Sequence, residues 1–294
     1  MPVARLDAVP APGLVLLGIV SVQFGAGLAK NLFDLLPPSA VVTLRLATSA
    51  VVLILVSRRH VGALARRWSR ADLAVAGGFG LSLATMNLSI YESFARIPLG
   101  IAVTIEFLGP LGIAVAFSRR RIDLVWVLLA AVGVLLLTRG DAAGVTAAGV
   151  GFALLSAAAW AAYILLSAAT GRRFPGSSGL ALASVVGTLL VLPVGVTTGG
   201  TDLLRPELLL AGASIGLLSS AIPYSLELEA LRRIPAKLFG VLMSLEPAVA
   251  ALVGLVVVGE VLHARQWAAI GFVVMACLGA ARTQSAAPPE APEA

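Results

Sequence analysis

Apolar stretches long enough to cross a bilayer follow one another along almost the whole chain of 294 residues. A helix needs about 20 predominantly apolar residues to cross the hydrocarbon core of a membrane. Charged residues make up 12% of this chain, against about 25% in typical soluble domains. The sequence therefore predicts an all-α integral membrane protein. Its ten predicted transmembrane helices lie near residues 13–32, 38–57, 73–95, 98–118, 124–138, 149–169, 178–198, 208–230, 236–258 and 266–282.

The basic residues lie in short clusters between these stretches, which is how membrane proteins encode their orientation. With a cytoplasmic N-terminus and alternating sides, 15 of the 21 Lys and Arg residues fall on the cytoplasmic side and 5 on the other, with Arg45 inside a span. This excess predicts that both termini are cytoplasmic, as expected for a bacterial inner-membrane protein. A net charge of +6 spread in this way does not indicate a nucleic-acid partner.

The ends of the chain and its metal-binding residue types add little chemistry. We expect residues 1–12 to form a cytoplasmic N-terminus and residues 283–294, rich in Pro, Ala and Glu, to form a disordered cytoplasmic tail. Cys277 is the single cysteine, and both histidines lie beside Arg residues at the ends of spans. The sequence therefore predicts neither a metal site nor a cofactor, and it leaves a homodimer open.

One segment of the chain occurs twice. Residues 92–98 and 229–235, which lie 137 positions apart, both read Glu-x-x-x-Arg-Ile-Pro. In each copy the Glu and Arg are spaced for a local ion pair at a helix end. The same offset relates Pro110 to Pro247 and Asp123 to Glu260. A constant offset of this kind indicates a duplicated unit.

The duplicated unit contains five spans, so we expect a first repeat at residues 13–138 and a second at residues 149–282. Because five is an odd number, the second repeat must be inverted in the membrane relative to the first. Two inverted five-helix repeats are a construction typical of secondary transporters, which place the substrate near the midplane between the halves. The repeat therefore favours transport over a purely structural role.

Carboxylates inside the spans are candidate functional groups, because a charge at the bilayer centre costs at least about 2.5–3.5 kcal/mol on insertion scales. Glu106, Glu227 and Glu246 lie within predicted spans. Pro110 removes the donor that would bond the carbonyl of Glu106. Pro247 similarly frees the carbonyl of Met243, one helical turn before Glu246, so each fourth helix is expected to break beside a carboxylate. Glu106 and Glu246 either meet a substrate ammonium or a proton, or pair with a neighbouring helix and fix the packing.

Two basic residues near or within the spans admit similar alternatives. Arg45 could pair with Glu106 inside the bundle, and we favour this packing role for it. Lys30 could hold a substrate carboxylate, although snorkelling to the membrane surface is the ordinary role of a lysine at the end of a span. Neither residue is predicted to bind substrate.

Polar and aromatic residues within the spans form a second candidate set. They fall on the first and third spans of each half, which favours a cavity shared between the halves. A single residue of this kind is most often an ordinary interhelical hydrogen bond or an interfacial anchor. As a group they are predicted to bind substrate: Gln23, Asn87, Tyr91, Trp160, Tyr163 and Tyr224.

Several short motifs resemble those of a known family. Glu106-Phe-Leu-Gly-Pro110, Trp160-Ala-Ala-Tyr163, Pro223-Tyr-Ser-Leu-Glu227 and Ser244-Leu-Glu-Pro247 with the later Gly259-Glu260 resemble the EamA family of the drug/metabolite transporter superfamily. They are most similar to its bacterial threonine/homoserine exporter branch, over essentially residues 13–282. The resemblance implies ten helices in two inverted repeats, a central cavity, and efflux of small amino acids.

The sequence therefore predicts a secondary transporter that exports small neutral amino acids or related metabolites by alternating access. No nucleotide-binding loop is recognisable, so a proton or solute gradient is the expected energy source. Efflux of drugs, nucleobases or other metabolites by the same fold is the alternative, in which the aromatic residues would stack on substrate. An intramembrane enzyme is a remote alternative, since the spans contain no mid-span histidine and no Gly-x-Ser-x-Gly elbow.

Overall fold

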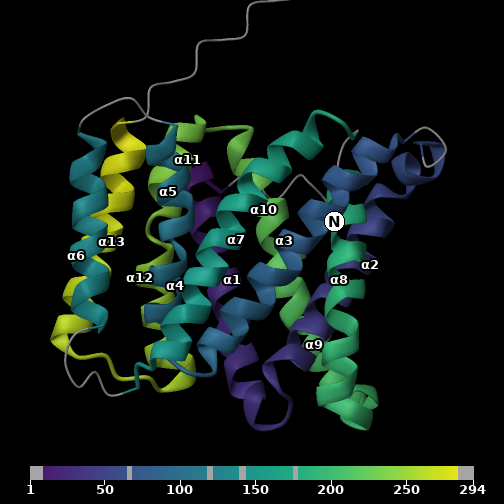
Figure 1. Cartoon of the computed structure of the whole chain (residues 1–294), viewed down its shortest axis with the longest axis horizontal. Coiled ribbons are helices and arrows are strands. Elements are labelled where there is room, and N and C mark those ends of the chain that lie inside the picture. The colour runs from purple at the N-terminus through teal and green to yellow at the C-terminus, as the bar shows by residue number, and fades with distance from the viewer. Residues whose placement is uncertain (1–8, 65–67, 118–121, 139–143, 175–177, 284–294) are drawn as a thin grey trace, which may run out of the picture.

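The computed structural model describes residues 9–64, 68–117, 122–138, 144–174 and 178–283, and every regular element in these ranges is helical (Figure 1). Short 3-10 turns follow α1 and α8, at Leu32–Asp34 and Gly200–Leu204, and π-helical turns lie at Leu217–Ala221 and Gly254–Val258. The α-helices are α1 (Ala11–Asn31), α2 (Pro38–Leu64), α3 (Arg70–Phe94), α4 (Leu99–Glu106), α5 (Leu108–Ala116), α6 (Asp123–Thr138), α7 (Ala147–Gly171), α8 (Ser178–Gly199), α9 (Pro206–Gly216), α10 (Ile222–Leu231), α11 (Ala236–Met243), α12 (Glu246–Val253) and α13 (Ala264–Thr283).

The prediction of an all-helical membrane protein is confirmed. Within the described residues, eight helical segments are long and apolar enough to cross a membrane, and two shorter apolar helices span 123–136 and 206–220. The shorter helices correspond to the fifth and eighth predicted spans. The fifth is short in the sequence itself, and the eighth is interrupted by the π-helical turn before α10. The finer count of ten spans therefore stays a prediction.

Two of the predicted spans are broken near their middle. In the first half, α4 ends at Glu106 and α5 begins at Leu108, with Pro110 in the first turn of α5. In the second half, α11 ends at Met243 and α12 begins at Glu246, with Pro247 directly after it. A proline in the first turn of a helix costs no hydrogen bond, so each proline lies where a new helix starts. Both breaks lie beside a carboxylate.

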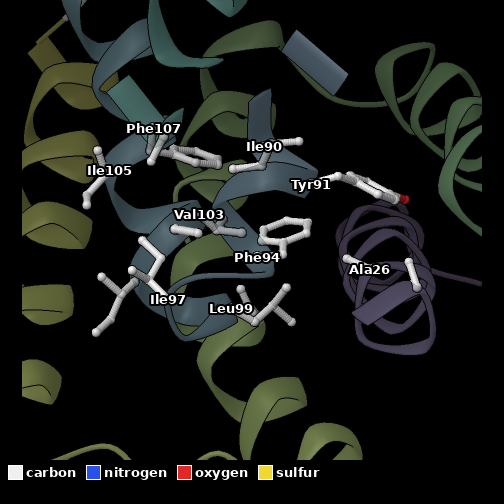
Figure 2. Packing of buried hydrophobic residues seen from close by; sticks show 14 of the residues in the cluster. Ala26, Ile90, Tyr91, Phe94, Ile97, Leu99, Val103, Ile105 and Phe107 are labelled. Atoms are coloured by element: carbon white, nitrogen blue, oxygen red, sulfur yellow. The ribbon is translucent and has the colours of Figure 1, made fainter. Parts of the chain in front are cut away.

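The helices pack in pairs that join residues far apart in the sequence. The most extensive pairs are α3 with α7, α2 with α8, α6 with α13, α3 with α8, and α1 with α10, and α4 also packs on α12. α6 and α13 stand side by side in Figure 1. Figure 2 shows part of the main apolar core, with Phe94 of α3 and Val103 of α4 near one another and Ala26 of α1 at the side. Large apolar side chains such as Leu128 and Leu210 remain exposed, as expected of surfaces that face lipid.

The ion pairs predicted at the two copies of the repeated segment are both formed. Arg96 pairs with Glu92 at the end of α3, and Arg233 pairs with Glu229 near the end of α10. The predicted terminal segments lie largely outside the described residues, which start at residue 9 and end at Thr283, the last residue of α13.

Candidate functional site

A cavity of about 220 Å³ lies between the helices of the two halves. Its wall combines three carboxylates, one guanidinium, two amides and several aromatic or apolar side chains. The lining residues are Val22, Gln23, Ala26, Arg45, Met86, Asn87, Ile90, Phe94, Val103, Glu106, Trp160, Tyr163, Ser219, Glu227, Met243 and Glu246.

The structure brings most of the predicted site residues together around this central cavity. Those that line it are Gln23, Asn87, Glu106, Trp160, Tyr163, Glu227 and Glu246. Tyr91 does not line it: its side chain is fully buried in the apolar core, beside Phe94. The side chain of Tyr224 lies outside what the structure describes, although its backbone belongs to α10.

Glu246 and Glu106 are each held by one neutral hydrogen-bond donor. Gln23 Nε2 of α1 donates to Glu246 Oε1 over 2.8 Å, and Ser156 Oγ of α7 donates to Glu106 Oε1 over 2.6 Å. The other oxygen of Glu246 and the side-chain oxygen of Gln23 are buried and make no hydrogen bond within the structure. Buried polar atoms without a partner are uncommon in proteins, so these two acceptors are available to a donor group that enters the cavity.

Glu227 is the third carboxylate of the cavity. It lies on α10 where that helix crosses α1 closely, so that a Cβ atom added to Gly18 would lie 3.5 Å from its Cγ. The three carboxylates repel one another whenever they are charged together, and an ammonium group or a proton entering the cavity relieves that repulsion. The cavity is therefore suited to cationic groups.

Arg45 does not form the ion pair that the sequence suggested. Within the described residues no carboxylate oxygen lies close enough to Arg45 to form a salt bridge, and Glu106 is bonded to Ser156 instead. The guanidinium carbon of Arg45 lies 5.3 Å from the centre of the Tyr91 ring, a distance typical of a cation–π contact. The ion pair with Glu106 that was expected to fix Arg45 in the packing is therefore not formed.

Aromatic residues from α7 give the cavity a firm wall. The rings of Trp160 and Phe107 meet edge to face, with centroids 5.0 Å apart and an interplanar angle of 90°. The ring of Tyr163 lies 5.0 Å from that of Phe79. Such pairs favour fixed ring positions. Phe107 is the residue at the break between α4 and α5, so this edge-to-face pair also supports the position of Glu106.

A second cavity, of about 280 Å³, adjoins the central one. It lies between α5, α7, α11 and α13 and shares Trp160 and Met243 with the central cavity. Its other lining residues are mostly apolar and include Cys277. Trp160 and Met243 therefore stand between the polar cavity and an apolar one.

The expectation that Lys30 snorkels to the membrane surface is wrong. Its Nζ lies 2.6 Å from Glu260 Oε1 and donates to the carbonyl of Ile97 over 2.7 Å. The other oxygen of Glu260 accepts from the backbone N–H of Leu99, the first residue of α4, over 2.8 Å. Gly259 adopts a positive φ of 79°, which glycine tolerates best, and thereby turns Glu260 back toward these partners. The lysine is recruited by a carboxylate 230 positions later in the chain.

We expect a double-mutant cycle at this ion pair to show a coupling of about 0.5–3 kcal/mol, the range for residues in contact. Lys30→Met alone leaves Glu260 without its cation, and both side chains are less than one-fifth exposed. The free energy of unfolding of the purified protein is measured for both single variants and for the double variant. The more exposed pair Arg173 and Asp72 is the control and should couple by less than about 1 kcal/mol. Equal coupling in the two pairs would contradict a special role for Lys30.

Several residues of the cavity were not predicted to be functional. Ser156 carries a sequence signal in retrospect, since it lies four residues before Trp160 and therefore on the same face of α7. Ser219 also lines the cavity, from the π-helical turn before α10, and its hydroxyl is buried without a partner. Met86 and Met243 read as ordinary apolar residues, and no signal in one sequence separates them from the core.

Comparison with known proteins identifies the kind of protein that carries this cavity. The EamA-like transporter family matches residues 147–282. The threonine/homoserine exporter RhtA of Escherichia coli (strain K12) is 39% identical over 272 residues, which cover 92% of this chain and 90% of RhtA. The chain belongs to the EamA family. This EamA protein is accordingly a multi-pass membrane transporter and not an enzyme.

Other relatives of this EamA protein agree with that assignment. RhtA of Salmonella typhimurium (strain LT2) is likewise 39% identical over 92% of this chain and 90% of its own length. An uncharacterized transporter of Bacillus subtilis, YwfM, is 29% identical over 45% of this chain and 44% of its own length. One solved crystal structure covers 91% of this chain and 96% of its own chain, with a TM-score of 0.58 and 18% identity, and so shows the fold alone.

Proposed function

We propose that this protein exports small neutral amino acids such as threonine and homoserine. The observation that carries the proposal is the central cavity, in which Glu106, Glu227 and Glu246 lie together with amides and aromatic rings. A zwitterion in a low-dielectric cavity needs an anionic partner for its ammonium group and donors for its carboxylate. The carboxylates supply the first. The amides of Gln23 and Asn87 each use one N–H within the protein and supply a donor with the other. The name of RhtA, a threonine/homoserine exporter, agrees with this chemistry.

The size of the cavity supports a small solute over a drug. Pockets for drug-sized ligands usually measure about 300–1,000 Å³, whereas the central cavity measures about 220 Å³. Efflux of drugs by stacking on Trp160 and Tyr163 would need a larger space than this cavity offers. Because both rings are fixed by other aromatic residues, they are better suited to shaping a small cavity.

We further propose that the chain is built as ten helices in two inverted repeats, 13–138 and 149–282. The pairing of the helices supports this arrangement. The third helix of the first repeat, α3, packs on the first helix of the second, α7, and the equivalent α10 packs on α1. The pairs α2 with α8 and α6 with α13 each join equivalent helices, and the pair α3 with α8 has its counterpart in the pair α9 with α2. This pattern is unchanged when the halves are exchanged, as inverted repeats around a midplane site require.

In this proposal the cavity opens alternately to the two sides of a bacterial inner membrane, with both termini in the cytoplasm. Lys30 and Glu260 then lie at the outer end, where they join α1, α4 and the turn before α13. The breaks at Phe107 and before Glu246 give α4 and α11 points at which to bend. A proton or solute gradient drives the cycle, and the cavity carboxylates are the groups available to carry a proton.

The test of the proposed function is efflux from bacterial cells that express the chain. Cells preloaded with labelled threonine or homoserine should release it several times faster than cells with empty vector. Lysine, a nucleobase and an aromatic drug are measured alongside, and their efflux should not change. Efflux of the drug or the nucleobase without threonine efflux would favour the alternative, and no change for any amino acid, with the protein present in the membrane, would refute the proposal.

A further inference from the structure

Arg45 is the only cation among the residues that line the central cavity. It lies in the first half of α2, inside the membrane-spanning segment 38–55. A charged side chain at this depth usually faces the interior of the bundle and pairs with an opposite charge. Arg45 is therefore expected to have an anionic partner.

No described residue provides that partner. Arg45 forms no salt bridge with a described carboxylate, although Glu106, Glu227 and Glu246 line the same cavity. Its Nε is buried and makes no hydrogen bond. By contrast, Arg96, Arg173 and Arg233 at helix ends all pair with carboxylates. A partly buried guanidinium group without an acceptor is costly, and its donors are available to a ligand that enters the cavity.

The surroundings of Arg45 hold its guanidinium group without using its donors. The group lies over the ring of Tyr91, whose side chain is fully buried, and Tyr91 in turn packs against Phe94 and Phe33. A cation–π contact engages the face of the guanidinium plane and leaves its N–H edge available. Asn87 lines the cavity one helical turn before Tyr91 and donates one amide N–H to the carbonyl of Leu83. Arg45 is thus presented as a preformed anion-binding fork.

We propose that Arg45 binds the carboxylate of the transported amino acid, while Glu106 and Glu246 meet its ammonium group. This inference rests on the proposed function and deepens it. The planar guanidinium group matches a carboxylate with two parallel hydrogen bonds, so Arg45 selects amino acids over amines that lack the carboxylate. Arg45 is then a specificity-determining residue, and Tyr91 acts through it as a positioning residue that does not touch the substrate.

The test compares an amino acid with its amide in purified protein reconstituted into vesicles. Labelled threonine is exchanged against internal threonine, and unlabelled threonine or threoninamide is added as competitor. The affinity of the wild-type protein for threonine should exceed its affinity for threoninamide by at least about ten-fold. A tenfold difference in affinity corresponds to about the free energy of one hydrogen bond to a charged group. Arg45→Gln should lower the affinity for threonine by at least ten-fold and reduce that preference to about two-fold. Arg45→Lys, which keeps the charge but loses the fork, should fall between them.

The preference is a ratio measured within one preparation, so it does not depend on how much protein folds. Arg173→Gln is the matched control, because it removes an arginine from an exposed ion pair and should leave the preference unchanged. Wild-type transport of threonine that persists in Arg45→Gln with the same preference would overturn the role of Arg45 and leave the proposed function standing. Absence of threonine transport by the wild-type protein would overturn the proposed function and, with it, this inference.

Discussion

Replacing Glu106 with glutamine is expected to reduce threonine efflux by about 10- to 150-fold, the equivalent of one charged hydrogen bond of about 1.5–3 kcal/mol. Glutamine has the size of glutamate, and its side-chain oxygen can still accept the hydrogen bond from Ser156. The substitution therefore keeps the local packing and removes only the negative charge. Efflux rates are measured from preloaded cells and divided by the amount of protein in the membrane.

The control for this variant is Glu207→Gln, which changes a carboxylate that is more than half exposed at the start of α9. It should transport like the wild-type protein. Exchange of internal for external threonine separates the two roles available to Glu106. If Glu106 binds the ammonium group, exchange falls with efflux, whereas if it carries only the coupled proton, exchange is retained. Efflux by Glu106→Gln within two-fold of the wild-type rate would show that the charge is not needed.

Replacing Gly109 with alanine is expected to lower the thermal stability of the purified protein strongly and to abolish most transport. A Cβ atom at this position would lie 2.2 Å from the backbone carbonyl oxygen of Ala157. Because the obstacle is backbone, α5 and α7 must move apart, and overpacking of this kind costs about 1–3 kcal/mol or more. The movement also separates Glu106 from Ser156, which is the neighbour of Ala157 in the chain.

The chain contains a matched control for this variant. Gly112 lies three residues further along α5, and a Cβ atom added there meets nothing within 4 Å. Gly112→Ala should leave the melting temperature unchanged or raise it, since alanine favours a helix over glycine by roughly 0.5–1 kcal/mol. Melting of both variants in detergent is followed beside their transport rates. Equal melting temperatures for the two variants would contradict the close contact of α5 and α7.

The helical class of this fold could be predicted because most of the chain lies in lipid. Lipid requires that backbone groups bond within each segment, so the apolar stretches and the all-helical class could be predicted directly. The breaks before α5 and α12 could be predicted from Pro110 and Pro247. No residue type signals the π-helical turn that precedes α10, because such a turn depends on packing against neighbouring helices. Helix pairs such as α2 with α8 could not be predicted either, since hydropathy does not say which face meets which helix.

The candidate site was predictable in its residue types and less so in its contacts. The insertion cost of a charge selected Glu106, Glu227 and Glu246, which all line the cavity. The same argument identified Arg45 as a charge inside a span. A single sequence does not show whether such an arginine pairs with a carboxylate of the protein or keeps its donors unpaired. Lys30 was misjudged because its partner is remote in the chain. Tyr91 is of a residue type that is common in binding sites. Only the packing shows that its side chain lies in the apolar core and does not line the cavity.

The pairing of α6 with α13 has a consequence for biosynthesis. α6 has its principal protein contact with α13, which ends at Thr283, near the end of the chain. A ribosome that has just completed the first half therefore releases α6 into the bilayer with its main neighbour still untranslated. The first half must wait in the membrane as a set of inserted but incompletely assembled helices. Two separately translated halves should then be able to find one another and assemble, because the contacts that complete each half are supplied by the other.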